Sequence, residues 1–408
     1  MRISIGALLY GLVCGSIIAQ TQAPPSRTWT SSDGKKMEAS FLGREGAGVK
    51  VRMTNGAVFT IPIDRLSSED QAYVRQQPAN DMAIAKPGAL AALKDWPRGV
   101  ALDEPPQPTV VTEDPAKKEF VYRSGHYEFR CDSKLGSNVV KEFSRIFEAT
   151  HLLNWQLPLD LKPTPEEGQE LFMARLYTNK EDYFANGGMT GSAGVYQRGE
   201  KALSVPLASL GVKMVGSRVS LEKISDDDNA TLIHEITHQM MNHWLPKLRT
   251  WYVEGSAEAV AMLEYQRGRF TFIGVKQRLS NYLQRRGSDG KNFTMLDPEE
   301  LFSLDGRTWS AALASIRGQA SQNYASAGLM TYFFYYLDGK GDAANIIAYL
   351  RELEAGDRNA EPDAFKKHLL RERSMDDFRE EVKKAFRKEG LNITFAPMGK
   401  NEGFSQSQ

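Results

Sequence analysis

Two histidines four residues apart, with a glutamate directly after the first, form the part of the sequence with the clearest chemistry. His234, Glu235 and His238 lie in the segment LIHEITHQ, residues 232–239. On a helix, residues four apart lie one turn apart on the same face. Two imidazoles in that arrangement can bind one zinc ion at about 2.0–2.1 Å each. Glu235 is then placed to accept a proton from a water held at the site. The segment predicts a zinc hydrolase, and most simply a peptidase.

The surrounding residues favour a helix for this segment. Three aspartates, Asp226 to Asp228, precede it and would stabilise the positive end of a helix that begins after them. An apolar face follows, made of Leu232, Ile233, Ile236, Met240 and Met241. Pro246 is expected to end the helix because its ring removes a backbone donor. The alternative is a helix whose two histidines merely face solvent or a core.

A second acidic segment offers the third ligand that a catalytic zinc requires beside its water. This segment, WYVEGSAE, spans residues 251–258, and a helical pattern runs from Tyr252 toward Tyr265. A reversal between two helices would bring Glu254 beside the histidines. Glu258 lies one turn further along, where it is expected to accept the free N–H of a ligating histidine and fix its tautomer. The alternative for Glu258 is a solvated surface acid.

Together, the two segments resemble the gluzincin metallopeptidases, whose third ligand is the glutamate of a W-x-x-E-G-x-A segment. The resemblance implies one Zn²⁺ per chain on His234, His238 and Glu254, with Glu235 as general base. Glu258 matches an acidic residue that the thermolysin-like branch carries four places after the ligand glutamate.

Residues 323–339 resemble the tyrosine-containing helix of aminopeptidase-like gluzincins. Tyr324 aligns with a tyrosine whose hydroxyl hydrogen-bonds the developing oxyanion, an interaction that acts mainly in the transition state. Core packing is the competing interpretation, because the segment is crowded with aromatic residues. As a whole, residues from about 122 to 391 most resemble a bacterial gluzincin-like family of unknown function.

One departure from the aminopeptidases bears on specificity. Their Gly-x-Met-Glu-Asn segment holds the free amino terminus of the substrate, but this chain has Thr190 where that glutamate would stand. Without the acidic anchor, an endopeptidase is favoured over an aminopeptidase. The segment 187–196 could still form an edge strand that pairs with a substrate backbone, or only a turn before a strand.

The first residues are typical of a secretory signal. A charged start, an apolar run from Ile3 to Ala19 and a small-residue exit predict a signal peptide over residues 1–23 and a secreted or periplasmic protein. The minority alternative is an uncleaved anchor, and Cys14 lacks the small preceding residue of a lipidation site. After cleavage no membrane span is expected. Cys131 would then be the only cysteine, which excludes intramolecular disulfides and cysteine-rich zinc sites.

The charge balance gives no sign of a polyanionic partner. Lysine and arginine number 51, and so do aspartate and glutamate, so neither nucleic acid nor an anionic membrane surface is expected to bind.

Residues 27–76 have the pattern of a separate small all-β domain. Short strand-like runs alternate with turn residues such as Asn55-Gly56, a strong hairpin signal, and Ser67 is placed as the N-cap of a following helix with Asp70 three residues on. The pattern resembles the SH3-like homology domain first described in the Sla adaptor proteins. The resemblance implies a small barrel that binds peptides or proteins. A barrel with no binding function of its own is the equal alternative.

Between the two parts we predict a linker over residues 77–118, because seven prolines fall between positions 78 and 115. Residues 119–395 are expected to form the catalytic domain, with an α+β fold in which strands precede the metal-binding helices. Residues 396–408 are expected to be disordered.

The predicted function is therefore a secreted zinc peptidase that acts on peptide or protein substrates, with a further protein or cell-surface partner for the SH3-like domain. One alternative is a catalytically silent peptidase fold that recruits partners through that domain, and another is a scaffold with a structural zinc. The remaining histidines, His126, His151, His243 and His368, receive no role.

Overall fold

The chain forms two units, residues 1–91 and 92–408. The computed structural model describes residues 26–45, 48–53, 58–76, 96–188, 192, 194–215, 218–221, 226–272, 275–315, 319–356 and 360–396. Several sequence predictions fall outside these residues: the signal peptide, the Asn55-Gly56 turn, Thr190, the first part of the linker and most of the tail. None of the helices in the described ranges is long and apolar enough to cross a membrane.

The first unit is a four-stranded antiparallel sheet with one helix. Its strands follow in the order β1-β2-β3-β4, and its elements are β1 (Ser26–Thr30), β2 (Lys36–Glu45), β3 (Gly48–Met53), β4 (Val58–Pro62), the short helix η1 (Ile63–Arg65) and α1 (Ser68–Gln76). The predicted strands and helix are confirmed. No closed barrel is formed by the described strands of this unit, so the predicted barrel is not confirmed; the sheet is an open meander.

A buried aspartate joins the helix of this unit to its first strand. Ser67 caps α1 as predicted, since its hydroxyl oxygen accepts the backbone N–H of Asp70 at 3.2 Å. The Asp70 carboxylate in turn accepts the Thr30 backbone N–H and the Arg27 guanidinium, each at 2.6 Å. The buried Trp29 ring lies at the centre of the small core that these contacts close.

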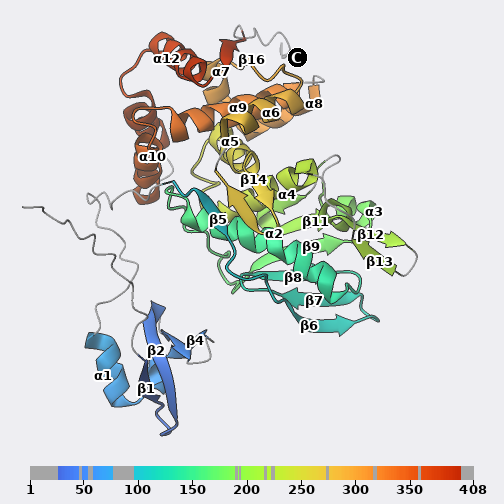
Figure 1. Cartoon of the computed structure of the whole chain (residues 1–408), viewed down its shortest axis with the longest axis vertical. Helices are drawn as coiled ribbons and strands as arrows, with labels where there is room; N and C mark the ends of the chain where they lie inside the picture. The colour runs from blue at the N-terminus through green and yellow to red at the C-terminus, as the bar shows by residue number, and fades with distance from the viewer. Residues whose placement is uncertain are drawn as a thin grey trace, which may run out of the picture. The chain divides into compact units, whose positions relative to one another are not determined.

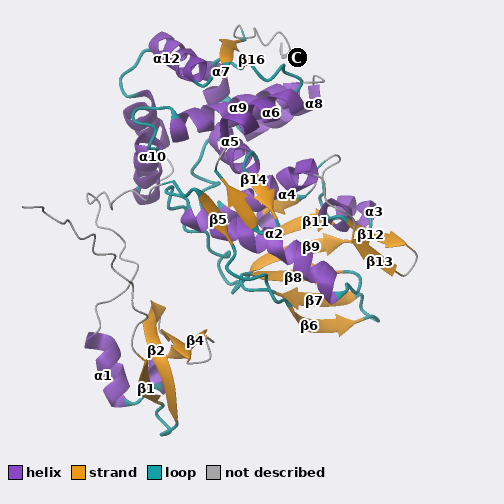
Figure 2. Ribbon diagram, viewed as in Figure 1, coloured by secondary structure: helices purple, strands orange, loops and turns teal. Residues whose placement is uncertain are grey.

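The second unit is built on a six-stranded mixed sheet (Figure 2). The strand order is β10-β11-β9-β8-β7-β6, with β6 (Thr109–Asp114), β7 (Glu119–Arg123), β8 (Tyr127–Cys131), β9 (Phe172–Tyr177), β10 (Val195–Gln197) and β11 (Ala202–Pro206). The pairs β8·β9 and β9·β11 are parallel, and the other pairs are antiparallel. The strand β10 lies at one edge of this sheet.

Part of the predicted proline linker belongs to this second unit. The strand β5 (Gly99–Ala101) pairs with β15 (Arg269–Thr271), which also pairs with β14 (Glu264–Gln266), and β6 forms the outer edge of the large sheet. The Trp96 ring lies 4.6 Å from that of Tyr336. Residues 96–118 are therefore part of the second unit. The strand β6 follows several prolines, yet it forms a hairpin with β7.

Helices cover the sheet and extend away from it (Figure 1). The helices are α2 (Ser137–Gln156), α3 (Lys180–Ala185), α4 (Asp226–Met240), α5 (Thr250–Ala261), α6 (Val275–Arg285), α7 (Pro298–Ser303), α8 (Gly306–Ser315), α9 (Gln319–Tyr336), α10 (Ala344–Ala355), α11 (Glu361–Ala364) and α12 (Met375–Lys388). The remaining elements are η2 (Arg198–Glu200), η3 (Leu207–Leu210), the π-helix η4 (Phe365–Leu370), β12 (Val212–Val215), β13 (Arg218–Leu221), β16 (Asn292–Met295) and β17 (Asn392–Phe395). The α+β class is confirmed.

Two predicted helix ends are wrong. The helix α4 ends at Met240, before Pro246, because the Asn242 side chain bonds the Thr164 carbonyl and the next backbone N–H in place of helix partners. The helix α5 ends at Ala261 and not near Tyr265. The residues that follow it pair with β15 instead, in a hairpin that turns on Gly268 in the left-handed region.

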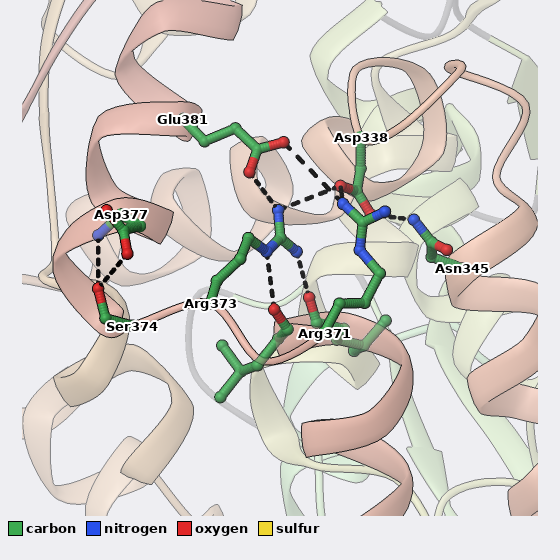
Figure 3. A network of polar contacts seen from close by, with 9 residues as sticks. Asp338, Asn345, Arg371, Arg373, Ser374, Asp377 and Glu381 are labelled. Atoms are coloured by element: carbon green, nitrogen blue, oxygen red, sulfur yellow. Dashed lines mark hydrogen bonds and ion pairs between the residues drawn. The ribbon is translucent and has the colours of Figure 1, made fainter.

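A buried carboxylate organises the C-terminal helices (Figure 3). Asp338, just after α9, accepts hydrogen bonds from Asn345 Nδ2 at 2.7 Å, Arg371 Nη2 at 2.8 Å and Arg373 Nη1 at 3.3 Å. Arg373 also pairs with Glu381 on α12 at 2.6 Å. The Asp338 side chain is fully buried, so it depends on these donors for its charge.

Replacing Asp338 with alanine leaves two guanidinium groups without their buried partner. We expect Asp338→Ala to lower the free energy of unfolding by about 3 kcal/mol, as for other broken buried pairs. Urea denaturation of the full chain measures this change. Asp376→Ala is the matched control, because Asp376 pairs with Arg379 but is 94% exposed, and such pairs contribute about 1 kcal/mol at most. Equal losses in both variants would contradict the role given to Asp338.

Candidate metal centre

Helices α4 and α5 present the predicted ligands, and buried side chains hold both helices in place. Leu232 and Ile236 of α4 are fully buried, and the Gln239 amide donates to the Met173 carbonyl of β9 at 2.9 Å. Trp251 and Tyr252 at the start of α5 are fully buried as well. The apolar face that the sequence predicted for α4 therefore packs into the core, and the opposite face, which carries the histidines, points toward α5.

The three predicted ligand atoms meet at one point. His234 Nε2 and His238 Nε2 lie 3.0 Å apart, and Glu254 Oε2 lies 3.3 Å from the first and 3.4 Å from the second. Four ligands at tetrahedral angles and zinc distances would be about 3.3 Å from one another. The residues thus fit a zinc ion by both donor type and spacing. They remain reachable from solvent, since the His238 and Glu254 side chains are 13% and 17% exposed.

The electrostatics of this point favour a cation. Burial lowers the pKa of His234, but the hydrogen bonds to Glu254 and Glu258 outweigh burial and raise it to about 10. Burial alone would raise the pKa of Glu254, yet the two histidines hold it well below its usual range. Positive charge is therefore stabilised where the three ligand atoms meet, and either a proton on His234 or a metal cation supplies it.

Glu258 is buried and contacts the first ligand, so it is not a solvated surface acid. Its Oε1 lies 3.1 Å from His234 Nδ1, the ring nitrogen that faces away from the other ligands. Its Oε2 accepts hydrogen bonds from the Tyr282 hydroxyl and, at 2.6 Å, from Arg286 Nη2. Sequence reasoning missed Tyr282 and Arg286. Tyr282 lies on α6 and Arg286 directly follows its last residue, four positions later, but nothing in the local sequence links the two to Glu258.

Glu235 follows His234 on α4 and faces the edge of the large sheet. A Cβ at Gly194, just before β10, would lie 3.7 Å from the Glu235 Cβ. Burial raises the pKa of the Glu235 carboxyl, while the two neighbouring histidines oppose this effect. The carboxylate is therefore placed between the candidate ligands and the edge strand.

Tyr324 of α9 lies beside the candidate ligands, as the resemblance implied. Its ring packs edge-on against the His234 ring at 5.8 Å and against the Trp309 ring at 5.4 Å. Burial, with the Glu254 charge, raises the pKa of Tyr324 above its ordinary value, so the hydroxyl stays protonated and can donate a hydrogen bond. Packing and donation are both compatible with this position.

A second group of histidines, which sequence reasoning did not connect, comes from a part of the second unit that precedes α4 in the sequence. His126 Nδ1 contacts the buried Glu148 carboxylate at 2.6 Å, and the His126 and His151 rings stack at 3.9 Å with planes 25° apart. A metal ion lies near the plane of each ring that binds it, so nearly parallel stacked rings cannot share one ion without turning. Burial lowers the pKa of His151 to about 4, which keeps it neutral. This group ties the turn after β7 to α2.

The other two histidines lie away from the metal point. His243 is exposed and contacts the Thr164 hydroxyl at 2.7 Å, and His368 pairs with Glu352 at 2.7 Å.

Close contact between α5 and α9 sets the position of Glu254 relative to Tyr324. A Cβ on Gly255 would overlap the Ala327 carbonyl oxygen and the Thr331 hydroxyl, and would lie 2.8 Å from the Ala327 carbonyl carbon. On the facing helix, a Cβ on Gly328 would lie 3.0 Å from the Glu258 Cβ. Glycine is therefore required at position 255 for this approach, while an added Cβ at position 328 would require the Met262 and Glu258 side chains to shift.

Comparison with protein families gives a match for the first unit. Residues 19–82 match SLA1 homology domain 1, in agreement with the resemblance of residues 27–76. A search of curated proteins gave no match. The gluzincin resemblance of the second unit stays a prediction.

An added methyl group at Gly255 should force α5 away from α9. Because the clash is with backbone atoms, we expect Gly255→Ala to lower the free energy of unfolding by about 1–3 kcal/mol, the usual cost of overpacking. Thermal denaturation of the metal-free protein checks this. Gly306→Ala is the matched control, since a Cβ there meets nothing within 4 Å, and its effect should stay within about 0.5 kcal/mol. A Gly255→Ala protein as stable as the control would refute the close contact.

Proposed function

We propose that the second unit is a zinc-dependent peptidase in which His234, His238 and Glu254 hold one zinc ion. The observation that carries the proposal is the meeting of two Nε2 atoms and one carboxylate oxygen at 3.0, 3.3 and 3.4 Å from one another. A group of this composition, with one side reachable from solvent, suits an open catalytic site better than a closed structural one.

The chain's own residues would share the work of hydrolysis. A bound zinc ion supplies a Lewis acid and lowers the pKa of water at the site. Glu235 takes the proton from the attacking water and later delivers it to the leaving amine. The Tyr324 hydroxyl donates a hydrogen bond to the oxygen of the scissile carbonyl as negative charge develops on it.

The substrate that suits this arrangement is an extended peptide. The strand β10 lies at the sheet edge and packs against α4. In this proposal an extended peptide adds to the sheet along that edge. Glu235 faces the start of this strand. Because no acidic anchor for an amino terminus occupies position 190 of the sequence, we favour internal cleavage over removal of terminal residues.

The first unit would bring substrates or partners to the peptidase. Its match to SLA1 homology domain 1 supports a protein-interaction role. Given the predicted signal peptide, we propose that this role is exercised outside the cytoplasm. The catalytically silent alternative uses the same first unit, so activity of the second unit decides between the two.

Glu235→Gln should separate zinc binding from catalysis. The amide keeps the size of the side chain but cannot accept the proton, so we expect turnover to fall by about 10²- to 10⁴-fold with zinc content unchanged. Both proteins, loaded with zinc, are incubated with a mixture of unfolded proteins, and new termini are identified by mass spectrometry. Internal termini that form only with the parent protein support an endopeptidase.

Two results would count against the proposal. A parent protein that holds one zinc per chain yet forms no new termini would favour the silent binding protein. If the Glu235→Gln protein cleaves as fast as the parent, Glu235 is not the general base.

A further inference from the structure

We propose that Arg286 and Tyr282 are positioning residues of the metal centre, which hold the Glu258 carboxylate so that it orients His234 as a ligand. This inference rests on the proposed zinc-dependent function and names two residues that the HExxH and WxxEG segments do not contain. It concerns how one ligand is kept in place, and neither residue is assigned contact with substrate.

The two oxygens of Glu258 make different contacts. Oε1 faces His234 Nδ1 at 3.1 Å, while Oε2 is held by the Tyr282 hydroxyl and by Arg286 Nη2 at 2.6 Å. Two donors on one oxygen fix the rotation of the carboxylate, and therefore the direction in which the other oxygen accepts. A carboxylate that accepts from Nδ1–H selects the tautomer with a free lone pair on Nε2, the atom that faces His238 and Glu254.

The two donors are neighbours at the end of one helix. Tyr282 is a buried residue of α6, and Arg286 follows the helix directly, with its backbone N–H donating to the carbonyls of Tyr282 at 3.3 Å and Leu283 at 3.1 Å. The Arg286 guanidinium carbon lies 4.9 Å from the centre of the Tyr282 ring. Arg286 and Tyr282 therefore contact one another as well as Glu258.

Arg286 also supplies the positive charge that the buried Glu258 carboxylate needs. The Glu258 side chain is only 7% exposed, and a buried carboxylate needs a positive partner. Once His234 serves as a ligand its imidazole is neutral and cannot be that partner. With Arg286 present, the carboxylates of Glu235, Glu254 and Glu258 are balanced by a divalent ion and one guanidinium.

Among the two histidine ligands, Glu258 orients His234. The other ring nitrogen of His238, Nδ1, is buried without a hydrogen-bond partner in the described part of the chain. The Arg286 guanidinium carbon also lies 5.7 Å from the centre of the Tyr324 ring, within range of a cation–π contact. One side chain thus contacts both the residue that orients a ligand and the tyrosine beside that ligand.

Zinc affinity tests the inference directly. The full chain and its variants are titrated with zinc in competition with a chelator, and the cobalt-loaded proteins are compared by visible absorption. We expect Arg286→Met to bind zinc 10- to 100-fold more weakly, the range for residues that support a ligand, and to shift the cobalt absorption band. Tyr282→Phe should weaken binding in the same direction but less, and Arg286→Lys should restore part of the affinity because it keeps the charge.

Arg285→Met is the matched control, because it removes a guanidinium from the neighbouring, exposed position of the same helix end. Its zinc affinity and cobalt spectrum should equal those of the parent. Melting temperatures of the metal-free proteins show whether each variant folds. Should Arg286→Met not fold, Tyr282→Phe, which loses a single oxygen atom, decides the question.

The outcomes separate this inference from the function on which it rests. Parental zinc affinity and an unchanged cobalt spectrum in Arg286→Met and Tyr282→Phe would overturn the inference while the zinc site stands. A parent protein that binds no zinc would overturn the proposed function first, and the positioning role with it.

Discussion

The close contact of α5 with α9 is the constraint on which the rest of the metal centre depends. One helix carries Glu254 and Glu258, and the other carries Tyr324. The two can meet side by side because Gly255 and Gly328 leave room for the facing backbone and side chains. Gly255 of the WxxEG segment is therefore required by packing. The same packing sets the position of the adjacent ligand, Glu254.

Two buried carboxylates of the second unit are satisfied in the same way. Glu258 beside the candidate ligands and Asp338 after α9 each accept hydrogen bonds from arginine and from a neutral donor. Such groups contribute specificity of arrangement more than stability, since desolvation offsets much of their attraction. In both places, segments far apart in the sequence are fixed relative to one another by a carboxylate.

The sequence predicted those features that depend on short-range spacing. His234 and His238 lie on one helix face because residues four apart always do, and Glu254 and Glu258 follow the same rule on the next helix. Tyr324 could be placed near the site only through the family resemblance.

Features that depend on tertiary contacts could not be predicted. Tyr282 and Arg286 look like ordinary residues in and just after a polar helix until the fold brings their side chains to Glu258 of α5. The stacking of His126 on His151 requires a strand turn to meet a helix. The prolines before β6 suggested a linker, yet pairing with β7 makes that segment part of the sheet, because sheet formation depends on a partner strand and not on composition alone.

The most direct test of the zinc site is anomalous diffraction from crystals grown with zinc, measured on both sides of the zinc absorption edge. The account predicts one strong peak between His234 Nε2, His238 Nε2 and the Glu254 carboxylate, with Glu258 on the far side of the His234 ring. The absence of a peak at that point, or a peak at His126 and His151 in its place, would contradict it.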